Sequence, residues 1–488
     1  MTHVIIYDNI NTVNNIYGDF MGELFDSRQR IISQLISARL EKGLSQEQLA
    51  RLIGTQRSNI CRIESGSQNL SLDMLIKICS ALGKDIKMNL EDRSEEMSNI
   101  YNLKLYDQTL ITFSLEEKGL EGLCVQIYNV REDLKEFLPL DLTPTSDGIL
   151  KWLQKRVIPK NRAFVDEILK SLGLSINNTK GIIDVCKGLS LNDSYWIIPQ
   201  EFSGTFREYN LYENRFSEVL SLVAYTGANA SNQAFTTSPE LTTQGMLRKA
   251  WRFLDNDGIY LYKGGTEGAA NTGNEPYSEY YAYQVANAMG LNAVPYDLEN
   301  WKGILASKCK LFTDIDTSFV PIGRIVKEGG IKACLDFYKS ISDEAFEELC
   351  SMLVFDAVIY NEDRHFGNFG ILRDNHTGKI LKPAPIFDNG LSLFNFAMPD
   401  DFKNISEYAK TRSTPYGVPF ESICKEVIGK KQAAQLRRLL GFKFKRHPSI
   451  NLPEERLQAI EKHIEVRARE LLSLPRNRTE KSKNKDAR

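Results

Sequence analysis

Apolar residues near the start of the chain recur at the spacing of α-helices. The first run contains Ile31, Ile32, Leu35, Ile36 and Leu40, which form one apolar stripe on a predicted helix. Residues 45–48 have the composition of a capping box that opens a second helix. Thr55 can cap a third helix over 56–64, and Ser71 opens a fourth. We therefore expect a compact bundle of short helices within residues 28–92.

The rest of the chain mixes the two-residue period of strands with the period of helices. Residues 147–187 are predicted to be helical, and the aromatic run at 193–199 indicates core packing or docking. Strands are predicted at 103–106, 124–128, 258–263, 371–372 and 386–387. The fold class expected from this order is multidomain α+β, with the all-α bundle first.

Composition limits the class of protein without identifying it. A chain of 488 residues with 42% hydrophobic and 25% charged residues should hold two or three globular domains. Its first residues lack a secretion signal, and it has no apolar run of membrane-spanning length, so we expect a cytoplasmic protein with no membrane partner.

Cysteines, histidines and charge refine that expectation. The 8 cysteines form no CxxC pair and the 5 histidines show no ligand spacing, which favours reduced thiols over a zinc site. The net charge is only −2, but residues 28–92 hold ten Lys and Arg against seven Asp and Glu. A short polar end, 476–488, is predicted to be a disordered basic tail.

Two polar strings in the last third of the chain carry the strongest chemical signal. Asp363 stands five residues before Asn368, and Asp388 follows after twenty more residues, behind an apolar Pro-Ile-Phe run. Phosphoryl transfer requires a carboxylate that orients the attacking hydroxyl, and an amide and a second carboxylate that hold Mg²⁺. The three residues fit those roles in that order, so we predict a kinase that uses ATP and Mg²⁺.

A kinase also needs an upstream lysine for the phosphates and a helix glutamate that holds it. Lys263 ends the strand predicted at 258–263, and Glu279 lies in the first turns of the next helix, with Glu275 as the competing residue. His365 is either a ligand of the active-site loop or a buried histidine whose ring nitrogen fixes the loop backbone, and the second role is favoured because Mg²⁺ prefers oxygen ligands. Arg364 could hold phosphate or pair with Asp356.

These strings resemble the HipA-like serine/threonine kinases, which share a distant fold with phosphatidylinositol kinases. The resemblance rests on NxDRHxxN at 361–368 and FDNGxSL at 387–393, and it implies the same roles for the Asp and Asn residues. It also implies a two-lobed kinase-like fold. The phosphate loop would then be 238–249, which lacks GxGxxG but contains Gly245. By the same resemblance Thr242, with Thr243 beside it, is the expected site of autophosphorylation.

The bundle resembles the lambda-repressor-like XRE helix-turn-helix family, through LSQEQLA at 44–50 and the positions that follow. The second helix of such a pair can expose side chains to base edges and phosphates. By resemblance Gln46 and Gln56 contact the phosphate backbone, and Arg57, Ser58 and Asn59 face the major groove; Arg62 is exposed on the same helix. A bundle used only for protein contacts is the alternative.

The domain limits expected from both resemblances divide the chain into six segments. They are an extension at 1–27, the helix-turn-helix domain at 28–92, a docking region at 93–200, an N-lobe at 201–335, a helical C-lobe at 336–475 and the tail at 476–488. The predicted function is a HipA-like toxin-type serine/threonine kinase fused to an antitoxin-like, autoregulatory domain. Its expected partners are a protein with a Ser or Thr acceptor and operator DNA, on which it could form a homodimer. The alternatives are a transcriptional regulator with an inactive or ligand-sensing kinase fold, and a lipid kinase.

Overall fold

The computed structural model describes residues 31–66, 68, 70–85, 99–118, 122–228, 237–254 and 257–475. The predicted extension at 1–27 and tail at 476–488 lie outside these residues. The chain divides into two compact units, one of residues 1–259 with 313–316 and the other of residues 260–312 with 317–488. Among the described residues, no helix has both the length and the apolar character needed to cross a membrane.

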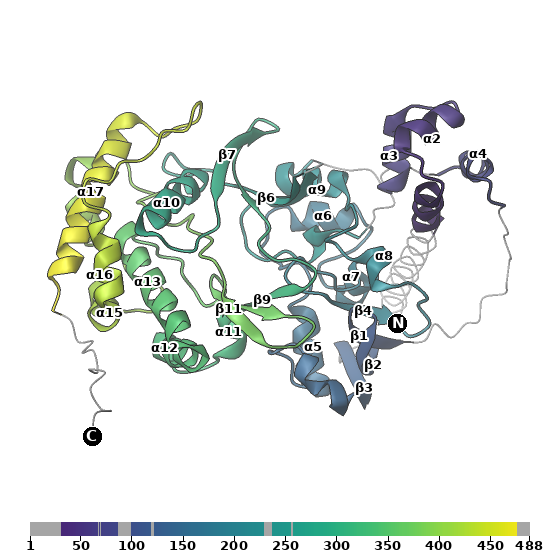
Figure 1. The fold of residues 1–488 in the computed structure, drawn as a ribbon, viewed down its shortest axis with the longest axis horizontal. Helices are drawn as coiled ribbons and strands as arrows, with labels where there is room; N and C mark the ends of the chain where they lie inside the picture. Colours follow the sequence, from purple (N-terminus) through teal and green to yellow (C-terminus); the bar gives the residue numbers. More distant parts are fainter. Residues whose placement is uncertain are drawn as a thin grey trace, which may run out of the picture. The chain divides into compact units, whose positions relative to one another are not determined.

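The first unit begins with the predicted bundle of short helices, drawn in purple in Figure 1. Residues 31–41 are helical, and α2 (Gln46–Leu52), α3 (Arg57–Glu64) and α4 (Leu72–Leu82) follow. Ser45 makes the capping box predicted for α2, and Ser71 caps α4. The third helix starts one residue later than predicted, and Thr55 does not cap it because Gln56 takes the cap position.

A four-stranded antiparallel sheet in the order β3-β2-β1-β4 follows in the same unit. Its strands are β1 (Ile100–Leu105), β2 (Gln108–Lys118), β3 (Gly122–Val130) and β4 (Tyr195–Pro199). Between β3 and β4 lie η2 (Glu132–Phe137), α5 (Ser146–Gln154), α6 (Val165–Lys170) and α7 (Thr179–Cys186). The aromatic run at 193–199 therefore forms an edge strand, in which Trp196 is fully buried.

The first unit continues through α8 (Phe206–Tyr209), α9 (Glu218–Thr226), η3 (Pro239–Leu241) and β5 (Lys249–Leu254). The segment predicted to be the phosphate loop was expected to join two strands. Instead it contains the turn η3 near its start and reaches β5 at its end. The described element directly before η3 is the helix α9, so the segment connects a helix to a strand.

The second unit begins within β6 (Gly258–Gly264), which pairs with β8 (Ile304–Lys310), and β8 pairs in turn with β7 (Tyr296–Trp301), both antiparallel. The helix α10 (Glu275–Met289) connects β6 to β7 and packs against both β7 and β8. Its buried side includes Tyr281, Ala282 and Val285, which join the main hydrophobic core of this unit.

The remaining elements of the second unit build that core. A small sheet in the order β11-β10-β9 is formed by β9 (Thr317–Pro321), β10 (Gly370–Asp374) and β11 (Ile380–Pro383). The helices are α11 (Ile322–Ile325), α12 (Gly330–Ile341), α13 (Asp343–Ile359), α14 (Ile405–Ala409), α15 (Phe420–Val427), α16 (Lys430–Arg437) and α17 (Glu454–Ser473), with the turn η4 (Asp401–Asn404). Most of α13 is buried, including every residue from 353 to 359.

The predicted fold class, an all-α bundle followed by mixed helices and sheets, is confirmed. The strand predicted at 386–387 is wrong, because Ile386 makes only an isolated parallel bridge to Ala293 and the strand lies earlier, at β11. Ile386 lies in a loop and packs into the hydrophobic core, which explains why it is apolar. Burial alone does not distinguish a strand from a buried loop.

Candidate functional site

Lys263 lies at the centre of a buried ion cluster in the second unit. Its Nζ is 3.0 Å from Glu279 Oε1 and also bonds Asp388 Oδ1. Burial lowers the pKa of the Lys263 ammonium, but the two carboxylates outweigh burial, so the pKa lies above its usual value. The lysine is therefore a permanent cation at the place where the strand β6 ends.

The Asp388 turn is held from two sides. Glu279 Oε2 accepts a hydrogen bond from the Asn389 amide at 2.7 Å, and the Asp388 amide donates to the Tyr296 hydroxyl at 3.2 Å. Asp388 itself has a φ of 54°, a left-handed backbone that is uncommon outside glycine, asparagine and aspartate. An aspartate tolerates this conformation, and the turn directs the carboxylate towards Lys263.

Hydrogen bonds within the loop after α13 set the positions of Asp363 and Asn368. The Asp363 amide donates to Asn361 Oδ1 at 3.1 Å, and Asn368 Nδ2 donates to the Asp363 carbonyl at 2.9 Å. That bond uses the Asn368 nitrogen, so Oδ1 is its atom able to hold a metal. Burial and the nearby Asp388 raise the pKa of the Asp363 carboxyl.

Arg364 is buried, with 1% of its surface exposed, and its guanidinium connects several segments of the fold. Its Nε donates to Asp356 Oδ2 at 3.0 Å, and Nη2 donates to Asn389 Oδ1 at 2.5 Å. Nη1 donates to the Asn368 carbonyl at 3.0 Å and to the Phe387 carbonyl. One guanidinium thus joins both polar strings to α13, and of the two roles left open from the sequence it takes the pairing with Asp356.

His365 is exposed, and its Nδ1 accepts a hydrogen bond from the Gly367 amide at 3.0 Å. The favoured role of a ring nitrogen that fixes the loop backbone agrees with this bond, whereas the expected burial is wrong. A polar loop can hold such a ring in solvent because the ring needs only one local partner.

Glu275, the competitor of Glu279, has a different partner. It is buried and accepts hydrogen bonds from Thr266, from the hydroxyl at 2.7 Å and from the amide at 3.2 Å. Gly265 lies so close that a Cβ added there would be 2.8 Å from the Glu275 carboxylate. Glu275 therefore orders the turn after β6, while Glu279 bonds the lysine.

The predicted phosphate loop belongs to the first unit, and its threonines are bonded inside that unit. Thr242 is 5% exposed and donates through Oγ1 to the Leu189 carbonyl at 2.8 Å. Thr243 donates to the Pro239 carbonyl at 2.7 Å. Gly245 has a φ of 93°, and an added Cβ would be 2.3 Å from Lys249 Nζ. Phosphate at Thr242 would require the loop to open first.

The helix-turn-helix bundle presents most of the predicted nucleic-acid residues to solvent. Gln56, Arg57, Ser58 and Arg62 are exposed, whereas Gln46 and Asn59 are half-buried. Gln46 Nε2 donates to Glu64 Oε2 at 2.9 Å. Arg62 Nη2 donates to Asn59 Oδ1 at 2.6 Å. Three of the predicted residues, Gln46, Asn59 and Arg62, are thus already bonded within the bundle, so binding nucleic acid would exchange these bonds.

Three residues of the ion cluster were not singled out from the sequence. Tyr296 and Asn389 hold the Asp388 turn, and Asn361 donates to Asp356 Oδ1 at 3.1 Å. Asn361 and Asn389 belong to the two polar strings, which was a usable signal. Tyr296 is distant in the chain, and no pattern connects it to Asp388.

The donors at this site are of the kind that Mg²⁺ selects. Asp388 and Asn368 offer a carboxylate and an amide oxygen, and Mg²⁺ is usually bound by one or two such groups together with phosphate oxygens and water. Over the described ranges, no cluster of three or more His, Cys, Asp or Glu suits a metal ion. The carboxylate of Asp388 and the amide oxygen of Asn368 are donors that suit a hard cation shared with a phosphate ligand.

Comparison with known proteins identifies the start of the chain. The helix-turn-helix family HTH_3 matches residues 35–88. An uncharacterised HTH-type transcriptional regulator of Haemophilus influenzae is 30% identical over 89 residues, which cover 17% of this chain and 91% of that protein. The N-terminal part of the chain belongs to this helix-turn-helix family, and the predicted XRE-type domain is confirmed.

A second relative is the serine/threonine-protein kinase CtkA of Helicobacter pylori. It is 30% identical over 175 residues, which cover 32% of this chain and 53% of that kinase. The chain thus spans about half the length of the curated kinase it matches. The predicted relation to kinases is supported by this similarity.

Two solved structures are also similar. The crystal structure of the proinflammatory kinase CtkA from Helicobacter pylori matches at 19% identity with a TM-score of 0.39, over 47% of this chain and 90% of that chain. A complex of HipA, HipB and operator DNA from Shewanella oneidensis matches at 13% identity with a TM-score of 0.46, over 76% of this chain and 97% of that chain.

Proposed function

We propose that the chain is an ATP- and Mg²⁺-dependent serine/threonine protein kinase of the HipA-like type, joined to a DNA-binding helix-turn-helix domain. The observation that carries the proposal is the buried cluster of Lys263 with Glu279 and Asp388. A lysine between two carboxylates is costly to bury, and kinases use such a lysine to hold nucleotide phosphates. The similarity to a serine/threonine kinase supports the same conclusion.

The predicted site residues have different roles in this reaction. Asp363 orients the acceptor hydroxyl and takes its proton, and the carboxylate is suited to this because burial raises its pKa. Asn368 and Asp388 would hold Mg²⁺, and Lys263 would contact the phosphates. When bound, Mg²⁺ and ATP supply charge neutralisation and the γ-phosphoryl group. Gly245 would let the phosphate loop approach the nucleotide, and His365 would keep the backbone of the Asp363 loop in place.

The regulatory half of the proposal concerns DNA. Gln46, Gln56, Arg57, Ser58, Asn59 and Arg62 would contact an operator, as phosphate and base contacts of a recognition helix. A homodimer would read two half-sites. This arrangement would let the chain regulate its own expression, as an antitoxin-like domain fused to a toxin-type kinase.

Autophosphorylation at Thr242 or Thr243 would regulate the kinase. A phosphate adds a charge of about −1.5 to −2, which repels nucleotide phosphates. It would also break the Thr242 bond to the Leu189 carbonyl, so the loop could not return to its present position.

Labelled ATP and Mg²⁺ test the kinase activity. The purified wild-type protein should transfer label to itself or to a protein substrate, and Asp363→Asn and Asp388→Ala should not. Glu344→Gln is the matched control, because this glutamate lies exposed at the start of α13. Label transfer by Asp363→Asn at the wild-type rate would contradict the proposed site. Absence of transfer by the wild type, with ATP bound, would favour a ligand-sensing kinase fold.

A further inference from the structure

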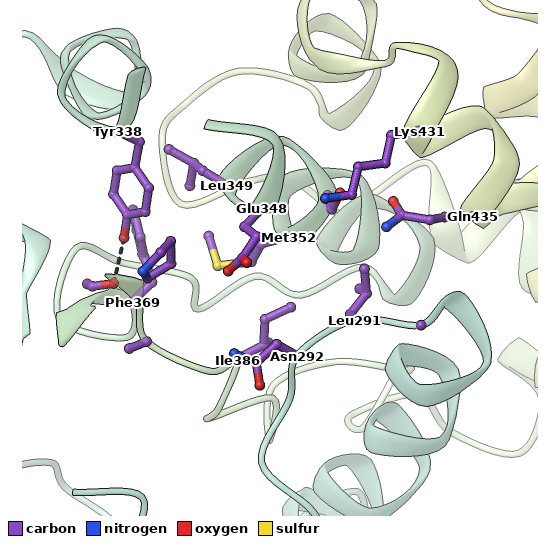
Figure 2. Close-up of a pocket in the computed structure, with 15 residues that line it drawn as sticks. Leu291, Asn292, Tyr338, Glu348, Leu349, Met352, Phe369, Ile386, Lys431 and Gln435 are labelled. Atoms are coloured by element: carbon purple, nitrogen blue, oxygen red, sulfur yellow. Dashed lines mark hydrogen bonds between the residues drawn. The ribbon is translucent and has the colours of Figure 1, made fainter. Parts of the chain in front are cut away.

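A cavity of about 160 Å³ lies in the second unit, and its lining includes Phe369, which follows Asn368, and Ile386, which precedes Asp388. Figure 2 shows its lining, which comes from α12, α13, α16, the turn after α10 and the segments beside β10 and β11. Most of the wall is apolar and is formed by Leu291, Leu349, Met352, Phe369, Pro383 and Ile386. A dry cavity of about 150 Å³ holds a benzene ring. The space is therefore sufficient for a branched aliphatic or phenyl group.

One polar atom in the wall has no partner. Gln435 is 5% exposed, and its buried Oε1 accepts no hydrogen bond from any residue that the structure describes. Figure 2 shows the Gln435 side chain reaching from α16 towards the cavity. A buried carbonyl oxygen left unpaired costs about 1–3 kcal/mol. A ligand that donates a hydrogen bond here would remove this cost.

Two hydroxyl groups in the lining already donate hydrogen bonds within the protein. The Tyr338 hydroxyl donates to the Gly370 carbonyl at 2.7 Å. The Ser351 hydroxyl donates to the Glu347 carbonyl at 2.8 Å. Among the described lining residues, Gln435 Oε1 is thus the buried side-chain atom that lacks a hydrogen-bond partner.

Two opposite charges accompany the Gln435 oxygen. Glu348 lines the cavity from α13 and Lys431 lines it from α16, and the described side chains of these two residues form no ion pair with each other. Burial raises the pKa of the Glu348 carboxyl, and Lys431 opposes that rise. Lys431 and Asn292 are exposed, so the cavity can be reached from solvent. The wall therefore offers an anion, a cation and a neutral acceptor around an apolar floor.

We propose that this cavity binds a free α-amino acid with an apolar side chain. The ammonium group would donate to Gln435 Oε1 and pair with Glu348, and the carboxylate would pair with Lys431. The side chain would fill the apolar floor. A simple amine would lack a partner for Lys431, and a fatty acid would leave Gln435 Oε1 unpaired, so the zwitterion satisfies the wall best.

Binding would act on the proposed kinase site through the walls. Phe369 directly follows Asn368, and Ile386 stands two residues before Asp388. The Ile386 amide donates to the Asn292 carbonyl at 2.9 Å, and the Val294 amide donates to the Ile386 carbonyl at 2.9 Å. A ligand packed against these segments would restrict both metal-binding side chains. This consequence rests on the proposed function, whereas amino-acid binding does not.

Calorimetric titration of the full chain without ATP tests the binding. L-leucine and L-phenylalanine should bind saturably, and 3-methylbutylamine and 4-methylpentanoate should bind at least about tenfold more weakly than L-leucine, since each lacks one charged contact. Gln435→Met keeps the side-chain size and should also weaken L-leucine binding about tenfold or more, and Met352→Trp should abolish it. The affinity of Glu348→Gln for L-leucine is compared with that of Glu344→Gln, which serves as the control because residue 344 lies outside the lining.

Amide exchange of residues 368–370 and 384–388, with and without L-leucine, measures the effect on the site. Slower exchange in the wild type and no change in Gln435→Met is the expected result. No binding of either amino acid, or equal binding in Gln435→Met and the wild type, would overturn the proposal. Neither measurement depends on kinase activity, so amino-acid binding can be judged even if the proposed kinase activity is absent.

Discussion

Replacing Arg364 by methionine should unfold the second unit at a much lower temperature. Methionine keeps the length of the side chain but removes the charge and all donors. Asp356 is 3% exposed, and its carboxylate would then be buried without a cation. Breaking a buried ion pair from one side costs about 3–5 kcal/mol. At roughly 2–4 °C per kcal/mol for a unit of this size, we expect Tm to fall by about 10 °C.

The double variant Arg364→Met, Asp356→Asn separates charge from packing. An amide at 356 needs no cation and still accepts from Asn361, so the double variant should recover a large part of the lost Tm. Arg437→Met is the matched control, since Arg437 is exposed at the end of α16, and its Tm should change little.

The pH dependence gives an independent check on the same variant. Burial raises the pKa of Asp356 even with Arg364 present, and loss of the arginine should raise it further. A folded-state pKa above the unfolded value means that stability is gained as pH falls, because the folded state then binds the proton more tightly. The Tm deficit of Arg364→Met should therefore shrink from pH 8 to pH 5. A Tm equal to that of Arg437→Met, or a double variant no more stable than the single one, would refute this account of Arg364.

Three further changes are expected to have measurable effects. Lys263→Met should destabilise the second unit by about 3–5 kcal/mol because Glu279 is fully buried, and adding Glu279→Gln should restore most of that loss in urea unfolding; no difference between single and double variants would contradict the ion cluster. Burial lowers the pKa of His463 to about 4, below its unfolded value, so stability should be lost as pH falls from 6.5 towards 4, by about 3 kcal/mol in all. His463→Phe should remove this acid sensitivity in thermal scans, and an unchanged pH profile would count against it. Arg57→Ala with Asn59→Ala should abolish a gel shift with the chain's own promoter and leave kinase activity intact, whereas unchanged DNA affinity would move recognition to another surface.

The sequence by itself determined the local structure of the bundle and predicted the chemistry of the two polar strings. Ser45 and Ser71 begin helices through bonds to residues three positions away, and such bonds depend only on neighbours in the chain. The order of Lys263, Glu279, Asp363, Asn368 and Asp388 was likewise sufficient to predict phosphoryl transfer, since that reaction fixes which side chains are needed.

Only the tertiary structure decided which partners those side chains take. Arg364 had two open roles, and its choice of Asp356 depends on how α13 packs against the Asp388 turn. Ile386 was apolar enough for a strand, but it lies in a buried loop because its backbone partner is the turn after α10. Tyr296 and the cavity beside Gln435 combine residues from distant elements. Periodicity records which residues are buried, but the contacts among buried residues are set by packing between elements that are far apart in the chain.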